Sequence, residues 1–370
     1  MLRPLILLAA INASMATLPL HADWKKDTVL VSRKDKAIVV RHPGSDTILF
    51  EHADPQLAIE WGLRKVGTTV LLEGEYTVSD RIDIPRAGVT LIVDQKAVLR
   101  LNPESRHTTI DFKSRNAGYW QMLPMIYNKG HDNVRILMFG TLEKWKVENK
   151  SNGRQTLPIM FDGRNERGTC GLSGGLMMVT GHATDSFWLV DSSRVRVPVV
   201  ALDTAPGAAL VLEGCEDCHL GLIASIAPEK GGKTAETIDL NSRNIDISID
   251  RLVGERSQEI IDCNESHVVV QEVVSIGPPR KMFGRGPVSG PRYTDRRSFG
   301  SRSLDVRKVS ILGDAVSSRL LHEVPKLPGS LPTFTVRTTV EVILRDGRKK
   351  RYTESTNFDL RGQEARAESR

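Results

Sequence analysis

Two short stretches of the chain carry acidic residues at matching places. They read Glu-Thr-Ile-Asp-Leu-Asn over residues 236–241 and Glu-Ile-Ile-Asp-Cys-Asn over residues 259–264. Because side chains alternate along a β-strand, the apolar neighbours of each aspartate should point inward and the aspartate outward. A third stretch, 210–219, adds one more carboxylate when it is overlaid without gaps. The sequence therefore predicts five acidic side chains on one face, as candidate catalytic residues: Glu213, Glu236, Asp239, Glu259 and Asp262.

Carboxylates on neighbouring parallel strands would lie about 4.8 Å apart, or about 9.6 Å across three strands. Two such groups repel, so one tends to keep its proton while the other stays ionised. Glycosidic hydrolysis needs this arrangement, with an acid for the leaving oxygen and a base or nucleophile across the bond; short separations suit retention and longer ones inversion. The same oxygens are suitable ligands for Ca²⁺. The alternative is a solvated acidic face without a catalytic role, because a repeat places residues of the same type above one another whatever their function.

Basic residues follow the last of these stretches. Residues 277–302 are rich in Gly, Pro and Arg, which predicts an exposed loop. Such a loop could fold over the acidic face and bind sulfate or carboxylate groups of an acidic polysaccharide, or it could stay solvated. His267 could assist proton transfer, or it could be an ordinary surface histidine. The candidate substrate-binding residues are Arg243, His267, Arg280, Lys281, Arg292 and Tyr293.

The acidic stretches belong to a longer imperfect repeat. Five segments overlay around one turn, with equivalent positions at residues 128, 180, 213, 239 and 262, so the steps are 52, 33, 26 and 23 residues. The first step is twice 26 and leaves room for one further, poorly marked unit. Short apolar strands without intervening helices at this period are typical of a right-handed parallel β-helix, an all-β solenoid. Asn241 and Asn264 fall on the same turn position, where stacked Asn side chains can bond along the axis.

The start of the chain has the pattern of an exported protein. One positive charge precedes an apolar run that is too short to span a bilayer, and Leu20-His21-Ala22 offers a small-residue cleavage site. We therefore expect a signal peptide over residues 1–22, with a buried N-terminal strand or helix as the alternative. Residues 23–53 should form a capping segment of short strands. Asp54 and Pro55 then begin a short amphipathic helix that could plug one end of the solenoid.

The remaining boundaries and the composition complete the predicted organisation. The helix and solenoid should span residues 54–324, and residues 325–370 should form a hairpin turning at Asp346-Gly347 and a charged tail. With 51 Lys and Arg against 45 Asp and Glu, the net charge is +6, an excess that a polyanion could use. Four cysteines are too few for a disulfide framework; export allows a Cys215–Cys218 bridge, but this lone pair lacks the second half of a zinc site.

Two parts of the sequence resemble a known superfamily. Residues 58–63, 70–76 and 82–85 resemble the opening of pectate-lyase-like β-helix proteins, where a capping helix precedes a strand ending in Gly-x-Tyr. Residues 235–242 resemble the polygalacturonase coil with its Asn-Thr-Asp motif, which places Glu236 at the first catalytic aspartate and Gln258-Glu259 at the Asp-Asp pair. That pair, the Gly-His-Gly motif and the Arg-Ile-Lys motif are missing here. The resemblance therefore implies the superfamily of polysaccharide lyases and polygalacturonase-like hydrolases, but not a true polygalacturonase.

Together these features predict a secreted or periplasmic monomer that cleaves an acidic polysaccharide with paired carboxylates. A lyase is one alternative, because Lys230, Arg243 and Arg256 on nearby turns could supply the base for β-elimination. A non-catalytic carbohydrate-binding or envelope-associated β-helix is another. We expect no nucleic-acid partner, because the basic residues are not interleaved with aromatic ones. We also expect no membrane association after signal cleavage and no obligatory cofactor, with Ca²⁺ as an optional ligand.

Overall fold

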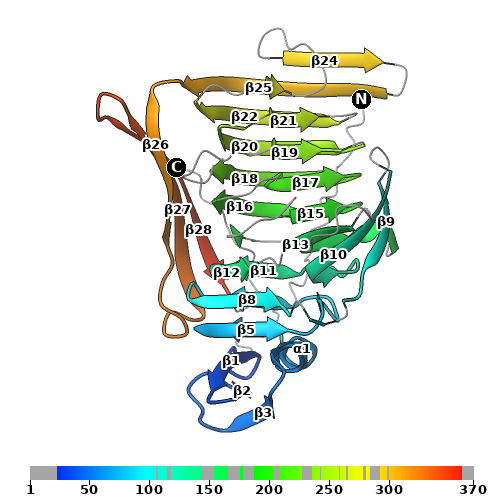
Figure 1. Ribbon diagram of the computed structural model, residues 1–370, viewed down its shortest axis with the longest axis vertical. Helices are drawn as coiled ribbons and strands as arrows, with labels where there is room; N and C mark the ends of the chain where they lie inside the picture. Colours follow the sequence, from blue (N-terminus) through cyan, green and yellow to red (C-terminus); the bar gives the residue numbers. More distant parts are fainter. Residues whose placement is uncertain are drawn as a thin grey trace, which may run out of the picture.

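The computed structural model of the 370-residue chain describes residues 23–102, 104–105, 107–114, 118–143, 154–165, 176–177, 187–203, 208–226, 236–241, 243–257, 259–263, 266–277, 281–283, 292–297 and 300–360. Figure 1 shows that these residues form stacked β-strands with one α-helix at the lower end. The all-β class predicted from the sequence is confirmed. Within these ranges no helix is both long enough and apolar enough to cross a membrane. The predicted signal peptide lies outside the described residues.

The largest sheet runs along the whole stack and is mainly parallel. Its parallel strands are β1 (Thr28–Lys34), β4 (Thr68–Leu71), β7 (Thr90–Val93), β11 (Arg135–Met138), β14 (Leu176–Met177), β16 (Arg196–Asp203), β18 (Glu216–Ile226), β20 (Ile245–Glu255), β22 (His267–Ile276) and β25 (Gly300–Leu312). Antiparallel strands extend both ends, namely β2 (Ala37–Arg41) and β3 (Ile48–His52) beyond β1 and β24 (Arg292–Arg297) beyond β25. We call this the first sheet.

A second parallel sheet packs against the first through a shared apolar core. Its strands are β6 (Ile82–Asp83), β10 (Gly118–Asn128), β13 (Arg154–Asp162), β15 (Phe187–Val190), β17 (Leu210–Glu213), β19 (Glu236–Leu240), β21 (Glu259–Cys263) and β23 (Lys281–Phe283), with β9 (Ile110–Ser114) antiparallel to β10. A short third sheet contains β5 (Gly74–Val78), β8 (Ala97–Leu101) and β12 (Thr141–Glu143). From β15 to β23, consecutive strands alternate between the first and second sheets.

The core between the sheets is built from every second side chain of each strand. In the second sheet, Ile238 and Leu240 of β19 are fully buried, and so is Ile261 of β21. Phe161 and Phe187 meet edge to face in the same core, with ring centroids 5.8 Å apart. Because these side chains point inward, the residues that alternate with them face outward. This alternation decides which side chains can form a site on the second sheet.

The helix α1 (Pro55–Lys65) begins where the sequence predicts. The side chain of Asp54 accepts a hydrogen bond from the backbone N–H of Gln56 at 2.9 Å, which satisfies one of the free donors at the helix start. Ile59 and Leu63 enter the core at its N-terminal end. Gly62 allows the close approach, since a Cβ there would lie 2.7 Å from Thr69 Oγ1. The helix therefore covers the end of the core, as a plug should.

A separate antiparallel sheet at the C-terminus contains β26 (Ala315–Glu323), β27 (Thr333–Leu344) and β28 (Lys349–Asp359). Figure 1 shows these strands running along one side of the stack. The predicted hairpin between β27 and β28 is confirmed, but a third strand, β26, joins it, so residues 315–323 belong to this sheet and not to the repeat. Its apolar face, with Phe334, Val336 and Val342, packs on the outer face of the first sheet. The predicted charged tail after Gly362 lies outside the described residues.

The register of the second sheet differs from the gap-free overlay. The register partners of Asp239 are Val211 and Asp262, so Glu213 lies two residues beyond the column that it was predicted to join. The gap-free overlay was centred on the turn and paired Glu213 with Asp239. In the structure the inward residues Leu210 and Ile238 are register partners, so the pairing of β17 with β19 is shifted by two residues. The segment at Met177 was also misplaced, because its strand β14 belongs to the first sheet. Strand β13 lies between β10 and β15 in the second sheet and occupies the place of the poorly marked unit.

The predicted loop over residues 277–302 contains strands. The second sheet continues through β23, whose Lys281 is the register partner of Glu259, and β24 forms an antiparallel pair with β25. Both β23 and β24 are edge strands, where charged side chains can remain solvated and even protect the edge. The Gly, Pro and Arg content therefore predicted a loop where parts of the chain form edge strands. Residues 278–280, 284–291 and 298–299 lie outside the described residues.

Candidate functional site

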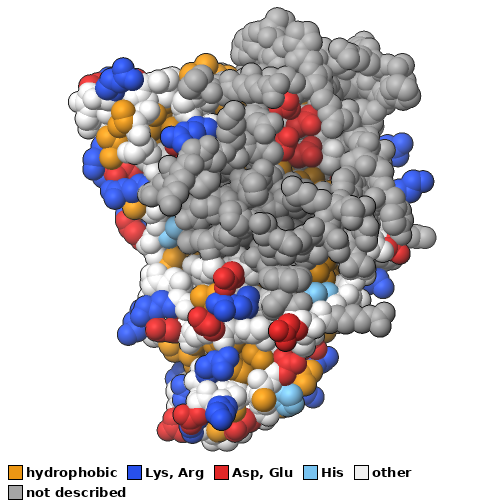
Figure 2. Space-filling model, viewed as in Figure 1, with side chains coloured by type: hydrophobic (Ala, Val, Ile, Leu, Met, Phe, Trp, Pro, Cys, Tyr) orange, Lys and Arg blue, Asp and Glu red, His pale blue; other side chains and the backbone are white. Residues whose placement is uncertain are grey.

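Two carboxylate pairs stand in register on β19 and β21. Glu236 is the register partner of Glu259, and Asp239 is the register partner of Asp262, as the sequence predicts. The backbones of neighbouring parallel strands lie about 4.8 Å apart, so the two members of each pair start from adjacent positions. Both aspartates alternate with core residues and therefore face outward. Figure 2 shows acidic side chains gathered where β19 and β21 lie.

This acidic face is less accessible than a simple solvated surface. Asp262 is only 8 % exposed, and Glu236, Asp239 and Glu259 are half-buried. Carboxylates are seldom this buried unless they are engaged with other groups, because removing a charge from water is costly. All four take part in polar or electrostatic interactions. The site thus combines close carboxylates with restricted access to water, which favours a chemical role over a merely solubilising one.

Glu213 does not belong to this group. It is 2 % exposed, and through Val190 it shares a register column with Asp162 of β13. Asp162 has no exposed surface and binds the guanidinium of Arg164 at 2.6 Å. It also accepts a hydrogen bond from the Tyr127 hydroxyl at 3.1 Å. The structure therefore places Glu213 in a second polar column that includes a buried ion pair, which sequence reasoning missed because no local motif marks Asp162.

The outward column that contains the aspartates is apolar over its first strands. Its earlier members are Met160, Trp188 and Val211, which form an outer cluster with Phe112 of β9. Trp188 and Phe112 meet edge to face, with ring centroids 5.3 Å apart. The column changes from apolar to acidic at Asp239. The β9–β10 hairpin thus covers the earlier part of the outward face, and the acidic pairs begin next to this covered part.

Two guanidinium groups lie on the same outward side, near β10 and β13. Arg81 stacks over the Tyr127 ring at 4.8 Å, and Arg164 stacks over the Phe112 ring at 4.5 Å. Arg81 also binds the carboxylate of Asp83 at 2.7 Å. Burial raises the pKa of Tyr127 far above its ordinary value, so its hydroxyl stays protonated and does not serve as a base. Arginines held in this way can present their remaining donors to an anionic ligand.

The other predicted binding residues do not gather at the acidic pairs. Arg243 is exposed in the turn after β19, with φ of 65°, and His267 is the exposed first residue of β22. Both lie at the corner between the two sheets, beyond the ends of β19 and β21. Arg292 and Tyr293 belong to β24, at the far edge of the first sheet, and Arg280 lies outside the described residues. Lys281 is the register partner of Glu259, whereas Arg292 is the register partner of Asp305, which does not belong to the acidic pairs.

The turn after β19 is held by Asn244, which the sequence did not single out. Its side chain is fully buried and accepts a hydrogen bond from the backbone N–H of Cys215 at 2.9 Å. Its amide donates to the Leu212 carbonyl at 3.2 Å and contacts Ser266 Oγ at 3.0 Å. Asn244 therefore ties together the chain that follows β17, β19 and β21. The predicted stacking of Asn241 on Asn264 is not tested, since Asn264 lies outside the described residues.

A second group of titratable side chains lies between the first sheet and the C-terminal sheet. His219 contacts Asp250 through Nε2 at 3.3 Å and Ser248 Oγ through Nδ1 at 3.0 Å. Hydrogen bonding to Asp250 raises the pKa of His219. Burial, and then the charge of Asp250, raise the pKa of Glu354 on β28. Asp250 thus influences the pKa of a histidine on the first sheet and of a buried carboxyl on the C-terminal sheet.

Neither a metal site nor a disulfide is found among the described residues. No three His, Cys, Asp or Glu side chains in these ranges are arranged to hold a metal ion, and a Ca²⁺ ligand stays an untested expectation. Cys215 and Cys218 are both buried free thiols, so the bridge that export would allow is not formed. Burial raises the pKa of the Cys215 thiol and disfavours the reactive thiolate.

Comparisons with known proteins do not identify a family for this chain. No protein-family model matches it, and no match was found among curated proteins or among solved structures. The function must therefore be argued from the arrangement of its own residues.

Proposed function

We propose that this chain is an exported right-handed parallel β-helix protein of the pectate-lyase-like kind, which binds and hydrolyses an acidic polysaccharide. Support for the β-helix comes from the alternation of consecutive strands between two parallel sheets around one core. Each strand from β15 to β21 pairs with the strand two positions further along the chain, as successive coils of a solenoid do. A helix at the N-terminal end of the core is consistent with a solenoid cap.

The observation that carries the proposed chemistry is the register of two carboxylate pairs on β19 and β21. Neighbouring strands give separations of about 5 Å, the range that suits a retaining glycosidase. The longer separation across three strands, which suits inversion, is not offered by this column because Glu213 lies outside it. We assign Asp262, the more buried of the two, as the acid and Asp239 as the nucleophile. Glu236 and Glu259 lie at the starts of the same two strands, three residues before the aspartates.

The acidic character of the substrate is supported by positive charges on the same side of the molecule. Arg81 and Arg164 are oriented by aromatic rings and carboxylates on the outward face of the second sheet. A polymer that extends from the acidic pairs toward β13 and β10 would meet these guanidinium groups. Arginine binds carboxylate and sulfate groups in a bidentate manner, so uronic-acid or sulfated polymers fit better than neutral ones.

A panel of acidic polysaccharides tests this proposal through release of reducing ends. We expect Asp239→Asn and Asp262→Asn each to lower the rate on the active substrate by at least about a hundredfold, the usual contribution of acid–base catalysis. The control is Glu216→Gln, which removes an exposed carboxylate at the start of β18 in the other sheet. Nuclear magnetic resonance of the first-formed product should show a retained anomeric configuration. Full activity of both aspartate variants on a confirmed substrate would refute the assignment.

A polysaccharide lyase is the second candidate, and one observation favours it. Lys281 is the register partner of Glu259, which places a basic residue next to the acidic pairs, where β-elimination requires a base or a neutralising cation. A lyase leaves a carbon–carbon double bond in its product, which absorbs ultraviolet light. An increase in this absorbance on an acidic polymer would show that the protein is a lyase and not a hydrolase. Tight binding without any product would show that it is a non-catalytic binding protein.

A further inference from the structure

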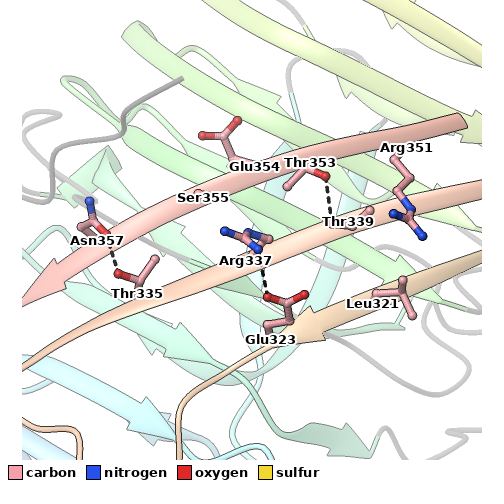
Figure 3. A pocket seen from close by; sticks show the side chains of 10 residues that line it. All are labelled: Leu321, Glu323, Thr335, Arg337, Thr339, Arg351, Thr353, Glu354, Ser355 and Asn357. Atoms are coloured by element: carbon pink, nitrogen blue, oxygen red, sulfur yellow. Dashed lines mark hydrogen bonds and ion pairs between the residues drawn. The ribbon is translucent and has the colours of Figure 1, made fainter. Parts of the chain in front are cut away.

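The outward face of the C-terminal sheet forms a groove. Its residues come from a later part of the chain than the acidic pairs, and its side chains are mainly hydroxyl, amide and basic groups. Side chains alternate along β26, β27 and β28, so that one face is apolar and packs on the first sheet. The opposite face encloses a groove of about 640 Å³. Figure 3 shows residues of all three strands around this groove. A groove of this size can hold several units of a chain molecule.

The floor of the groove is a row of hydroxyl and amide groups. Thr335 donates a hydrogen bond to Asn357 Oδ1 across the β27–β28 pair at 2.6 Å, and Figure 3 marks this bond. Thr339 and Thr353 form the next polar pair, with hydroxyl oxygens 2.9 Å apart. These cross-strand bonds fix the side chains while hydroxyl lone pairs and amide N–H donors remain for a ligand. Such a floor suits a molecule that is itself rich in hydroxyl groups.

Two cations, Arg337 and Arg351, and two carboxylates, Glu323 and Glu354, line the groove itself. With the neighbouring cluster around Glu341, the region holds four cations and three carboxylates. The carboxylate of Glu341 binds Arg319 at 2.7 Å, Arg351 at 2.7 Å and Lys349 at 3.6 Å. Hydrogen bonds from Arg351 and then Arg319 lower the pKa of Glu341 to about 2, so it stays ionised and holds these cations in place. The three basic side chains cover Glu341 completely, yet each is about half exposed itself. Their outer N–H donors therefore face the solvent in fixed positions.

A fourth cation, Arg337, lines the groove further along β27. It binds Glu323 at 3.3 Å, a contact that Figure 3 marks, and both side chains are more than half exposed. Arg351 is the register partner of Glu341, which follows Arg337 by four residues on β27. The backbone positions of the two arginines are therefore about 14 Å apart along the strand direction. A small anion could reach only one of them. The groove therefore matches a ligand that carries repeated negative charges.

We propose that this groove binds an extended segment of an acidic polysaccharide, as a second and non-catalytic binding site. The chemical class of the ligand rests on the proposed function; the site itself does not use the acidic pairs. Hydroxyl and amide groups along the floor would bind sugar hydroxyls, and Arg337 and Arg351 would bind carboxylate or sulfate groups. Nucleic acid fits less well, because no aromatic side chain lines the described groove to stack on bases.

Calorimetric titration of the full chain with charged oligosaccharides tests this site. The protein carries Asp262→Asn to prevent turnover, and the probes are oligogalacturonate, a heparin oligosaccharide and a methyl-esterified galacturonan as neutral control. We expect Arg337→Gln to weaken binding about tenfold or more, the effect of losing a charge-assisted hydrogen bond. Glu323→Gln should strengthen binding, because it removes the carboxylate that competes for Arg337. The matched control is Arg348→Gln, an exposed arginine that pairs with Asp346 at the hairpin turn.

Opposite effects of the two groove variants, with no change in the control, would support the site. Equal losses for Arg337→Gln and Arg348→Gln would mean non-specific charge attraction and would overturn it. Equal affinity for single-stranded DNA and for oligogalacturonate would overturn the polysaccharide assignment. The two proposals can fail separately, because binding is measured here without turnover. Binding to the groove by a protein that cleaves no polymer would refute only the catalytic proposal, and cleavage with unaltered binding in both groove variants would refute only the groove.

Discussion

His322 should make the protein less stable as the pH falls below neutrality. It lies on β26, with Nδ1 3.2 Å from the Thr338 hydroxyl of β27. Within the described residues, its Nε2 is buried and has no hydrogen-bond partner. Burial lowers the pKa of His322 from 6.5 to about 4, because the protonated imidazole would lose its hydration. The unfolded chain therefore takes up a proton near pH 6.5, whereas the folded chain does so only near pH 4.

The size of this effect follows from the shift. A pKa difference of two to three units corresponds to about 3 kcal/mol of unfolding free energy. This stability is fully present above about pH 7 and is lost as the pH falls toward about 4, where the folded protein also binds the proton. Glu354 has the opposite sign, since its pKa is raised in the folded state and its protonation at low pH favours folding. A single-site variant separates the two contributions.

Denaturant unfolding of the wild type and of His322→Gln, at intervals from pH 7.5 to pH 4.5, measures the contribution of His322. The free energy of unfolding of the wild type should fall relative to the variant by more than 1 kcal/mol per pH unit below about pH 6, because the variant has no proton to bind. His267→Gln, which removes an exposed histidine at the start of β22, is the control for loss of a histidine. Parallel pH profiles for the wild type and His322→Gln would refute the burial argument.

Three further predictions concern the positioning of the second sheet and the region around the C-terminal sheet. Asn244→Ala should lower the free energy of unfolding by about 2 kcal/mol or more, since it leaves buried backbone groups unpaired; an unchanged thermal midpoint would contradict this. Gly221→Ala should lower the thermal midpoint, because the new Cβ would lie 2.2 Å from a backbone oxygen, whereas Gly313→Ala, with nothing within 4 Å, should not. Asp250 raises the pKa of His219, so their contact adds stability below about pH 6.5, and this stability is lost as the pH rises through the raised pKa. In His219→Gln the free energy of unfolding should therefore not show this decrease between about pH 6 and 9.

Local patterns predicted the elements well, but they did not set the register between distant strands. The N-cap at Asp54 and the turn at Asp346-Gly347 depend on neighbours in the chain, and both are confirmed. The register of β19 against β21 was also predicted, because matching apolar residues accompany the carboxylates in both strands. Glu213 was placed wrongly because the overlay allowed no gaps around the turn, whereas the inward pair Leu210 and Ile238 sets a register shifted by two residues.

Part of the structure left no signal that a reading of local patterns could find. Asp162 and Arg164 form their ion pair beside Tyr127, which is 35 residues earlier, and nothing near either one marks the contact. Asn244 likewise bridges strands that are separated by long stretches of chain. The third strand of the C-terminal sheet escaped prediction because β26 follows the last repeat strand after a short turn and has a similar length. These are contacts that only the assembled sheets create.

The location of the acidic pairs follows from which outward faces the rest of the chain covers. The outer face of the first sheet is apolar at Ala224, Val253 and Val274, and the C-terminal sheet packs on it. The outer face of the second sheet is apolar as far as Val211, under the β9–β10 hairpin. An apolar face must be covered to be stable. From Asp239 onward the outward column of the second sheet is acidic, so in the proposed function this stretch is the part of the face that receives the polymer.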